Sequence, residues 1–135
     1  MNPKRESFYR GLFLTASVYD IVLGIIFTFF FKAAFGVLGI AHKLPEFSAY
    51  ISLIGAFLFV IGIAYWLIYR GDLIKNHDLI LVGALYKVAY SAIAFFYYFV
   101  GDIPHILFVS LFGVADLVFL TLMVNCYLYI GKLKK

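Results

Sequence analysis

Charged residues are scarce in this chain. Only 13% of its 135 residues are Asp, Glu, Lys or Arg, whereas a soluble globular domain carries about 25%. A chain with so little charge cannot cover a soluble surface of ordinary polarity. It also lacks the basic folded surface that a nucleic-acid interface requires, so we expect no nucleic-acid partner.

Cysteine and histidine are equally scarce. Cys126 is the single cysteine, which excludes an internal disulfide and a paired-cysteine redox reaction. His42, His77 and His105 fall at the edges of predicted helices or in loops, which disfavours a haem or a metal centre. No serine–histidine–acid set or phosphate-binding loop is present. We therefore expect no catalytic residues, no metal and no dedicated cofactor, and the sequence predicts a non-enzymatic protein.

Hydrophobic residues are abundant instead, at 65% of the chain. Four apolar stretches reach or approach the roughly 20 residues that a helix needs to cross a bilayer. Their continuity favours helices over barrel strands, which alternate over about 10 residues. The expected helices cover residues of about 9–31, 48–69, 79–100 and 106–130. The predicted fold class is all-α, a four-transmembrane-helix antiparallel bundle that forms a single integral membrane domain over residues 1–135.

The basic residues outside these stretches predict an orientation. With four crossings, two basic residues, Lys32 and Lys43, fall on one side of the membrane. Those on the other side are Lys4, Arg5, Arg10, Arg70, Lys75, Lys132, Lys134 and Lys135. Cytoplasmic segments are the ones enriched in Lys and Arg. We therefore expect both termini in the cytoplasm, with the chain in a bacterial inner membrane and lipids as its immediate partners.

Two features at the predicted helix ends have alternative interpretations. The first connection, KAAFGVLGIAHKLPEF (residues 32–47), is apolar: either a greasy connector resting on lipid, which we favour, or an amphipathic lid over the bundle. Aromatic residues such as Phe29, Tyr97, Tyr65 and Trp66 gather at both ends of the helices. An interfacial belt is the favoured interpretation. The alternative is an aromatic pocket for a flat lipophilic molecule such as a quinone, sterol or carotenoid.

Three charged residues interrupt the apolar stretches: Asp20, Lys87 and Asp116. An ionised side chain in hydrocarbon costs at least about 3 kcal/mol unless it has a partner. At a rise of about 1.5 Å per residue, all three lie roughly 12–21 Å from the predicted cytoplasmic ends of their helices. We therefore predict that the three side chains meet inside the bundle near the bilayer midplane.

Helical spacing identifies expected neighbours of these charges. Small and polar residues share a helix face with each charged residue, which permits close helix contact in lipid. The expected neighbours are Ser17, Tyr86, Tyr90 and Ser91. Gly24 and Gly113 lie on the same faces as the two acids.

Two carboxylates and one ammonium leave one negative charge if all three groups ionise. Burial disfavours that charge, so either one aspartate holds a proton or a cation joins the site. The favoured interpretation is a structural ion pair between Lys87 and Asp116 that fixes helix register. The alternative is a proton- or ligand-responsive site, since ionisable groups inside membranes often serve function.

The segments GALYK (residues 83–87) and GVAD (residues 113–116) carry a family resemblance. Together with four short-looped helices, the chain resembles small bacterial membrane proteins of the DoxX-like, largely uncharacterised type. The resemblance implies an accessory part of an oxidoreductase or thiol-related membrane complex, although this chain lacks the cysteine pairs of a direct thiol role. Small multidrug transporters share the size, the four helices and an acid in helix one, here Asp20, but Lys87 and Asp116 have no counterpart in them.

Three functional hypotheses follow. The favoured one is an accessory or structural subunit of a larger membrane complex, whose partners are other membrane subunits or a second copy of the chain. The second is a small proton-coupled transporter that uses the spare carboxylate. The third is a protein that binds a lipid or a lipophilic cofactor between the aromatic ends of the helices.

Overall fold

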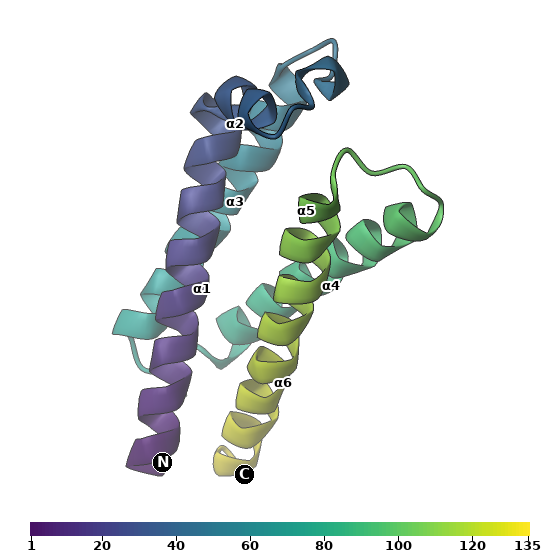
Figure 1. Cartoon of the computed structure of the whole chain (residues 1–135). Helices are drawn as coiled ribbons and strands as arrows, with labels where there is room; N and C mark the ends of the chain where they lie inside the picture. Colours follow the sequence, from purple (N-terminus) through teal and green to yellow (C-terminus); the bar gives the residue numbers. More distant parts are fainter.

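The structure, a computed structural model, describes all 135 residues and is helical throughout. Four helical spans, the last of them continuous over Ile106–Leu133, are long and apolar enough to cross a membrane. The four-helix bundle predicted from the sequence is confirmed (Figure 1). In chain order the elements are α1 (Pro3–Phe29), α2 (Phe31–Val37), η1 (Ala41–Lys43), α3 (Ala49–Arg70), α4 (His77–Phe99), α5 (Ile106–Val109), η2 (Ser110–Ala115) and α6 (Asp116–Leu133).

The first helix begins earlier than residue 9, because its N-terminus is capped. The Asn2 side chain accepts a hydrogen bond from the Lys4 backbone N–H at 2.9 Å. Asparagine is among the best N-cap residues, and a proline at the first helical position, here Pro3, has its φ already set for a helix. The polar N-terminal residues therefore extend α1 beyond its apolar stretch.

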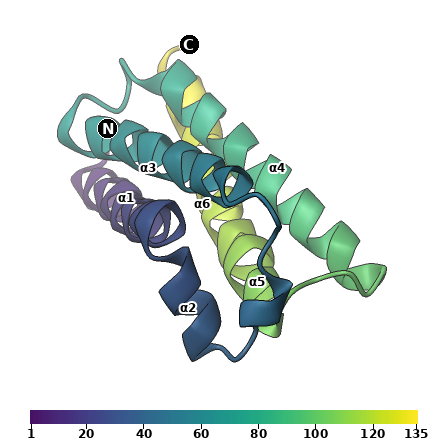
Figure 2. The ribbon, with the colours of Figure 1, turned by 90° about the horizontal axis from the view of Figure 1, so that it is seen from above.

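The bundle consists of two helix pairs. One half is formed by α1 and α3, and the other by α4 with the α5–η2–α6 span (Figure 2). Both termini lie at one end of the molecule, which we call the terminal end (Figure 1). The two halves are in contact toward the terminal end and diverge toward the opposite, distal end (Figure 1).

Glycines bring the backbones of α1 and α3 into contact. A Cβ atom on Gly24 would lie 2.6 Å from the Phe59 backbone nitrogen, and one on Gly62 would lie 2.6 Å from Cγ1 of Ile21. Neither site has room for a side chain. In lipid, where apolar surface gains nothing by leaving water, such close packing between small residues is what holds helices together.

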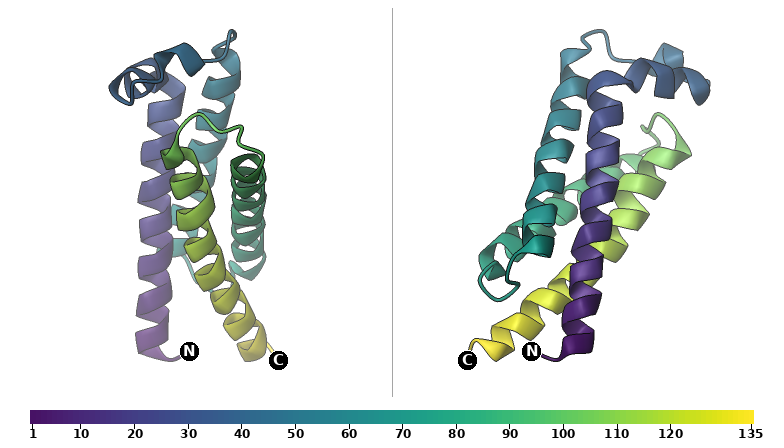
Figure 3. Two further views of the ribbon diagram at one scale, coloured as in Figure 1. Left: turned by 45° about the vertical axis from the view of Figure 1, so that its right-hand side comes forward. Right: turned by 90° about the vertical axis from the view of Figure 1, so that its left-hand side faces the viewer.

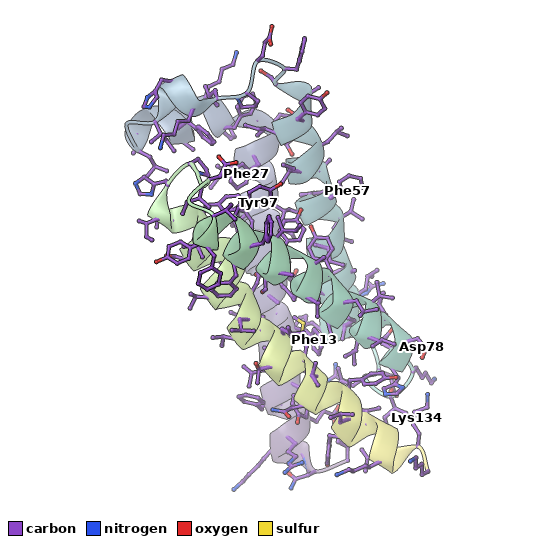
Figure 4. The ribbon with its side chains drawn as sticks, turned by 90° about the vertical axis from the view of Figure 1, so that its right-hand side faces the viewer. Phe13, Phe27, Phe57, Asp78, Tyr97 and Lys134 are labelled. Atoms are coloured by element: carbon purple, nitrogen blue, oxygen red, sulfur yellow. The ribbon has the colours of Figure 1, made fainter.

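The two halves share a packed core toward the terminal end. Phe13 of α1, Tyr65 of α3 and Met123 of α6 are completely buried in it. Phe13 lies among the helices, whereas Phe57 lies on the outer side of α3 (Figure 4). The two side chains differ in how tightly they are packed and not in polarity, because a helix surface that faces lipid is also apolar.

The connection after α1 crosses the distal end of the bundle (Figure 3). There α2 and η1 turn away from the axis of α1, and the ammonium of Lys43 donates a hydrogen bond to the backbone carbonyl of Pro104 at 2.9 Å. Pro104 belongs to the connection between α4 and α5. The two distal connections, one from each half, are thus joined by this hydrogen bond.

Candidate functional site: a buried charge cluster beneath an apolar pocket

Asp20, Lys87 and Asp116 meet in the interior and form what we call the charge cluster. The Lys87 ammonium donates to Oδ1 and Oδ2 of Asp20 at 3.1 and 3.0 Å and to Oδ1 of Asp116 at 2.9 Å. None of the three residues is more than 1% exposed. The predicted buried Asp/Lys/Asp cluster is therefore present, with Lys87 bonded to both acids rather than mainly to Asp116.

The charge cluster joins the two halves of the bundle. Asp20 comes from α1 in one half, whereas Lys87 and Asp116 come from α4 and α6 in the other. The Lys87–Asp116 pair thus holds one half together, and the Lys87–Asp20 pair ties that half to its neighbour. Breaking one partner of a buried ion pair is costly because it leaves an uncompensated charge, so the cluster fixes how the halves meet.

Three aromatic rings enclose the Lys87 ammonium. Its nitrogen lies 5.4 Å from the centre of the Tyr19 ring, 5.5 Å from that of Tyr65 and 5.2 Å from that of Phe119. Ring faces attract cations at such distances, most strongly where water is excluded. The rings therefore add to the stabilisation that the two carboxylates provide.

Sequence reasoning missed these three rings. Phe119 carried a usable signal, because it follows Asp116 by three residues and so shares its helix face. The sequence pattern predicts Tyr65 as a residue of the interfacial belt, and this prediction is wrong, since its side chain is completely buried. The neighbouring Trp66 is 41% exposed and stacks under Arg70, as a belt residue would.

The predicted neighbours of the cluster bond elsewhere. Ser17 donates to the Gly62 carbonyl at 2.8 Å, and Ser91 donates to the Gly113 carbonyl at 3.3 Å. Both serines therefore join helices through backbone oxygens rather than through the carboxylates. Tyr86 and Tyr90 pack their rings 4.7 Å apart, with no hydrogen bond to the cluster.

A π-helical segment, η2, leads directly into Asp116. In a π-helix the hydrogen bonds span five residues instead of four, a rare geometry that occurs frequently at functional sites. Carbonyl groups in η2 accept bonds from other helices: Tyr19 donates to Leu111 at 2.7 Å, and Ser91 donates to Gly113. These donors hold the irregular turn in place, and the turn sets the direction from which Asp116 enters the cluster.

Two buried polar atoms near the cluster have no hydrogen-bond partner: Oδ2 of Asp116 and the hydroxyl oxygen of Tyr86. Buried polar atoms in proteins are nearly always paired. Since Lys87 occupies the other three carboxylate oxygens, Oδ2 of Asp116 is the one acceptor of the cluster that stays free. The cluster thus retains capacity for one more hydrogen bond or positive charge.

An open pocket of about 840 Å³ lies between the halves at the distal end, and we call it the distal pocket. Ten of its fifteen lining residues are hydrophobic, and its charged members are Lys43 and Asp102 at the two connections. The lining residues are Phe27, Phe35, Lys43, Pro45, Ile51, Ile54, Ala89, Tyr90, Ile93, Gly101, Asp102, Ile103, Pro104, Phe108 and Phe112.

Phe27, Tyr90 and Phe112 form an aromatic floor between the distal pocket and the charge cluster. The Phe112 ring centre lies 5.7 Å from that of Phe27 and 5.5 Å from that of Tyr90. Each ring stands one or two helical turns on the distal side of a charged residue, on the same helix face. Phe27 lies on the distal side of Asp20, Tyr90 on that of Lys87 and Phe112 on that of Asp116.

No family model, curated protein or solved structure matches this chain. The site itself has three parts, which are a packed core at the terminal end, the charge cluster at the junction of the halves, and the apolar pocket above it.

Proposed function

We propose that this protein is a non-enzymatic integral membrane protein that binds a lipophilic small molecule in the distal pocket. The observation that carries the proposal is the pocket itself. Its volume of about 840 Å³ falls within the roughly 300–1,000 Å³ typical of small-molecule sites. Its mostly apolar lining with a few polar groups at one edge also has the usual composition of such sites.

The position of the pocket supports the same function. Side chains from both halves line it, with Ile51 and Ile54 on α3 facing Ala89 and Ile93 on α4. The charge cluster joins the two halves directly below the pocket. The pocket walls diverge from this junction and do not pack against each other. A preformed cavity loses little binding free energy to reordering. The aromatic lining suits a flat ring system such as a quinone or a sterol.

A pocket-filling variant tests the proposal. Ala89→Trp places an indole in the distal pocket, whereas Ala56→Trp makes the same change at an exposed alanine of α3 outside the pocket. Both variants and the wild type are reconstituted in zwitterionic nanodiscs and photolabelled with an uncharged alkylbenzene diazirine. We expect labelled peptides from the pocket in the wild type and in Ala56→Trp, and their loss in Ala89→Trp. Equal labelling in all three proteins would contradict ligand binding at this pocket.

The membrane setting is part of the proposal. Basic residues concentrate at the terminal end, where the ends of α1 and α6 and the α3–α4 connection meet. By the positive-inside tendency, the terminal end is cytoplasmic and the distal pocket opens toward the outer leaflet. We propose a bacterial inner membrane as the location, as expected for a DoxX-like protein.

The accessory-subunit hypothesis stays a prediction. Large apolar side chains such as Phe57 and Val60 are exposed on the helices, but contact with lipid and contact with another subunit both require such a surface. Extraction from native membranes in a mild detergent, followed by mass spectrometry of co-purified proteins, tests it. A lone monomer without a stoichiometric partner would contradict it and leave ligand binding untouched.

A further inference from the structure

We propose that the ligand of the distal pocket is a lipophilic cation. This inference rests on the proposed function, because it names the class of molecule that the pocket accepts. Three features support it: the charge balance of the cluster, the free acceptor on Asp116 and the aromatic lining of the pocket.

The charge balance is the first feature. Asp20 and Asp116 oppose a single cation, Lys87, so the ionised cluster carries a formal charge of −1 beneath the pocket. The charged residues at the pocket edge, Lys43 and Asp102, cancel each other. With both aspartates ionised, the pocket therefore faces a net negative field that water, excluded from the cluster, screens only weakly.

The free acceptor is the second feature. Asp116 is 99% buried, with 1% of its surface exposed, and its Oδ2 atom has no donor. Phe112 of the aromatic floor lies four residues, about one turn of the π-helical segment, on the distal side of Asp116. The unsatisfied carboxylate oxygen thus lies one turn below the pocket floor. A positive charge above the floor is attracted to the negative charge of this carboxylate.

The aromatic lining is the third feature. Five aromatic rings line the pocket: Phe27, Phe35, Tyr90, Phe108 and Phe112. Ring faces attract ammonium-type cations, and cages of such rings are a recurrent site for quaternary ammonium groups. An uncharged ligand gains apolar contact and ring stacking from these rings, but no attraction to the charge of the cluster. A lipophilic cation gains contact with the rings and attraction to the cluster together.

The expected size of the effect follows from the charge alone. A unit charge about 10 Å from the cluster, at an intermediate effective dielectric, is attracted strongly enough to raise affinity on the order of tenfold. Asp116→Asn removes this net charge while leaving Lys87 paired with Asp20, and its amide oxygen can still accept from Lys87. Asp20→Asn also brings the net charge of the cluster to zero, by a substitution in the other half of the bundle.

Tetraphenylphosphonium and tetraphenylborate, which match in shape and differ in the sign of their charge, are the probes. Each probe competes with the uncharged diazirine label for the wild type, Asp116→Asn and Asp20→Asn. Labelling of Ala89→Trp, in which the pocket is filled, gives the background from sites outside the pocket. We expect the phosphonium to displace the label from the wild type and to weaken about tenfold in both Asn variants. The borate is expected to gain affinity in the Asn variants, because the repelling charge is gone.

The outcomes separate the two proposals. Equal competition by both probes on the wild type, or unchanged phosphonium affinity in both Asn variants, overturns the cation inference and leaves a neutral lipophilic ligand. If the pocket of the wild type is not labelled at all, the proposed function is overturned instead. Melting temperatures of the Asn variants in the same nanodiscs establish that they are folded. If only one of the two folds, that variant alone decides the result.

Discussion

Tyr65 of α3 hydrogen-bonds across to α4, donating from its hydroxyl to the carbonyl oxygen of Gly83 at 2.8 Å. The ring of the same tyrosine lies over the ammonium of Lys87. A methyl group at residue 83 would lie 2.5 Å from Cε1 of Tyr65. Only glycine therefore leaves enough room for the tyrosine ring at this position. Tyr65 thus makes a further bond between the halves, next to the charge cluster.

Gly83→Ala is expected to destabilise the protein by about 1–3 kcal/mol, because the added methyl group overpacks a closed interior. Unfolding in mixed micelles, followed by circular dichroism, measures the change. Gly11→Ala is the matched control, since Gly11 is a helical glycine with nothing near its missing Cβ. That variant should be neutral or up to about 1 kcal/mol more stable. Similar losses in both variants would rule out the packing explanation.

Lys87→Met should destabilise the bundle by about 1–4 kcal/mol, because two buried carboxylates lose their cation. The same unfolding assay measures the loss. Adding Asp116→Leu is expected to recover part of it. Adding Asp20→Leu as well should recover more, because Lys87 bonds both acids. Purely additive losses along this series would mean that the three residues are not coupled.

The orientation of the chain can be tested by cysteine labelling. In a Cys126→Ser background, Lys135→Cys should react with a membrane-impermeant maleimide only after cells are lysed. Asp102→Cys, at the distal end, should react in intact cells. These outcomes follow from the concentration of basic residues at the terminal end. The reverse pattern would place the distal pocket in the cytoplasmic leaflet.

Asp72 gives a pH-dependent contribution outside the membrane-spanning helices. Its carboxylate accepts the backbone N–H groups of Lys75 at 3.1 Å and Ile74 at 2.8 Å. These hydrogen bonds, with the nearby charges of Lys75 and Arg10, lower the pKa of the Asp72 carboxyl. A lowered folded-state pKa gives stability that is present above the unfolded value of about 3.9 and is lost as pH falls through the folded value.

Asp72→Ala should accordingly melt at a lower temperature than the wild type at neutral pH. The difference should shrink as pH falls from about 5 toward about 2, because both proteins then lack the ionised carboxylate. Melting temperatures over this range in detergent measure it. A difference that stays constant with pH would show that Asp72 acts through packing or turn geometry alone.

The sequence predicted the helices because their signal is local. The length of an apolar run decides whether it can span a membrane, and the rise per residue decides the depth of Asp20, Lys87 and Asp116. A membrane makes that depth informative, because charged groups near the midplane need one another. The meeting of the three side chains therefore followed from spacing along each helix, before any contact was known.

The parts that sequence reasoning missed depend on how separate helices are placed. Nothing in the order of residues marks Ser110–Ala115 as a π-helical turn, since the donors that hold it, Tyr19 and Ser91, come from other helices. Tyr65 looked like a belt residue because it neighbours Trp66 in the sequence. The rotation of α3 relative to α4 decides which of the two adjacent aromatic side chains points inward. This rotation cannot be read from the sequence of either helix alone.

The amino-acid order alone determined that this chain has four helices long and apolar enough to cross a membrane and that its buried charges must pair, because the cost of exposing polar groups to hydrocarbon is set residue by residue. Only the tertiary structure decided that Lys87 joins both acids and that the two halves diverge above them to leave the distal pocket. Those features arise from the angle and register between helix pairs, which in lipid are set by the close fit of small residues and buried polar bonds across distant parts of the chain.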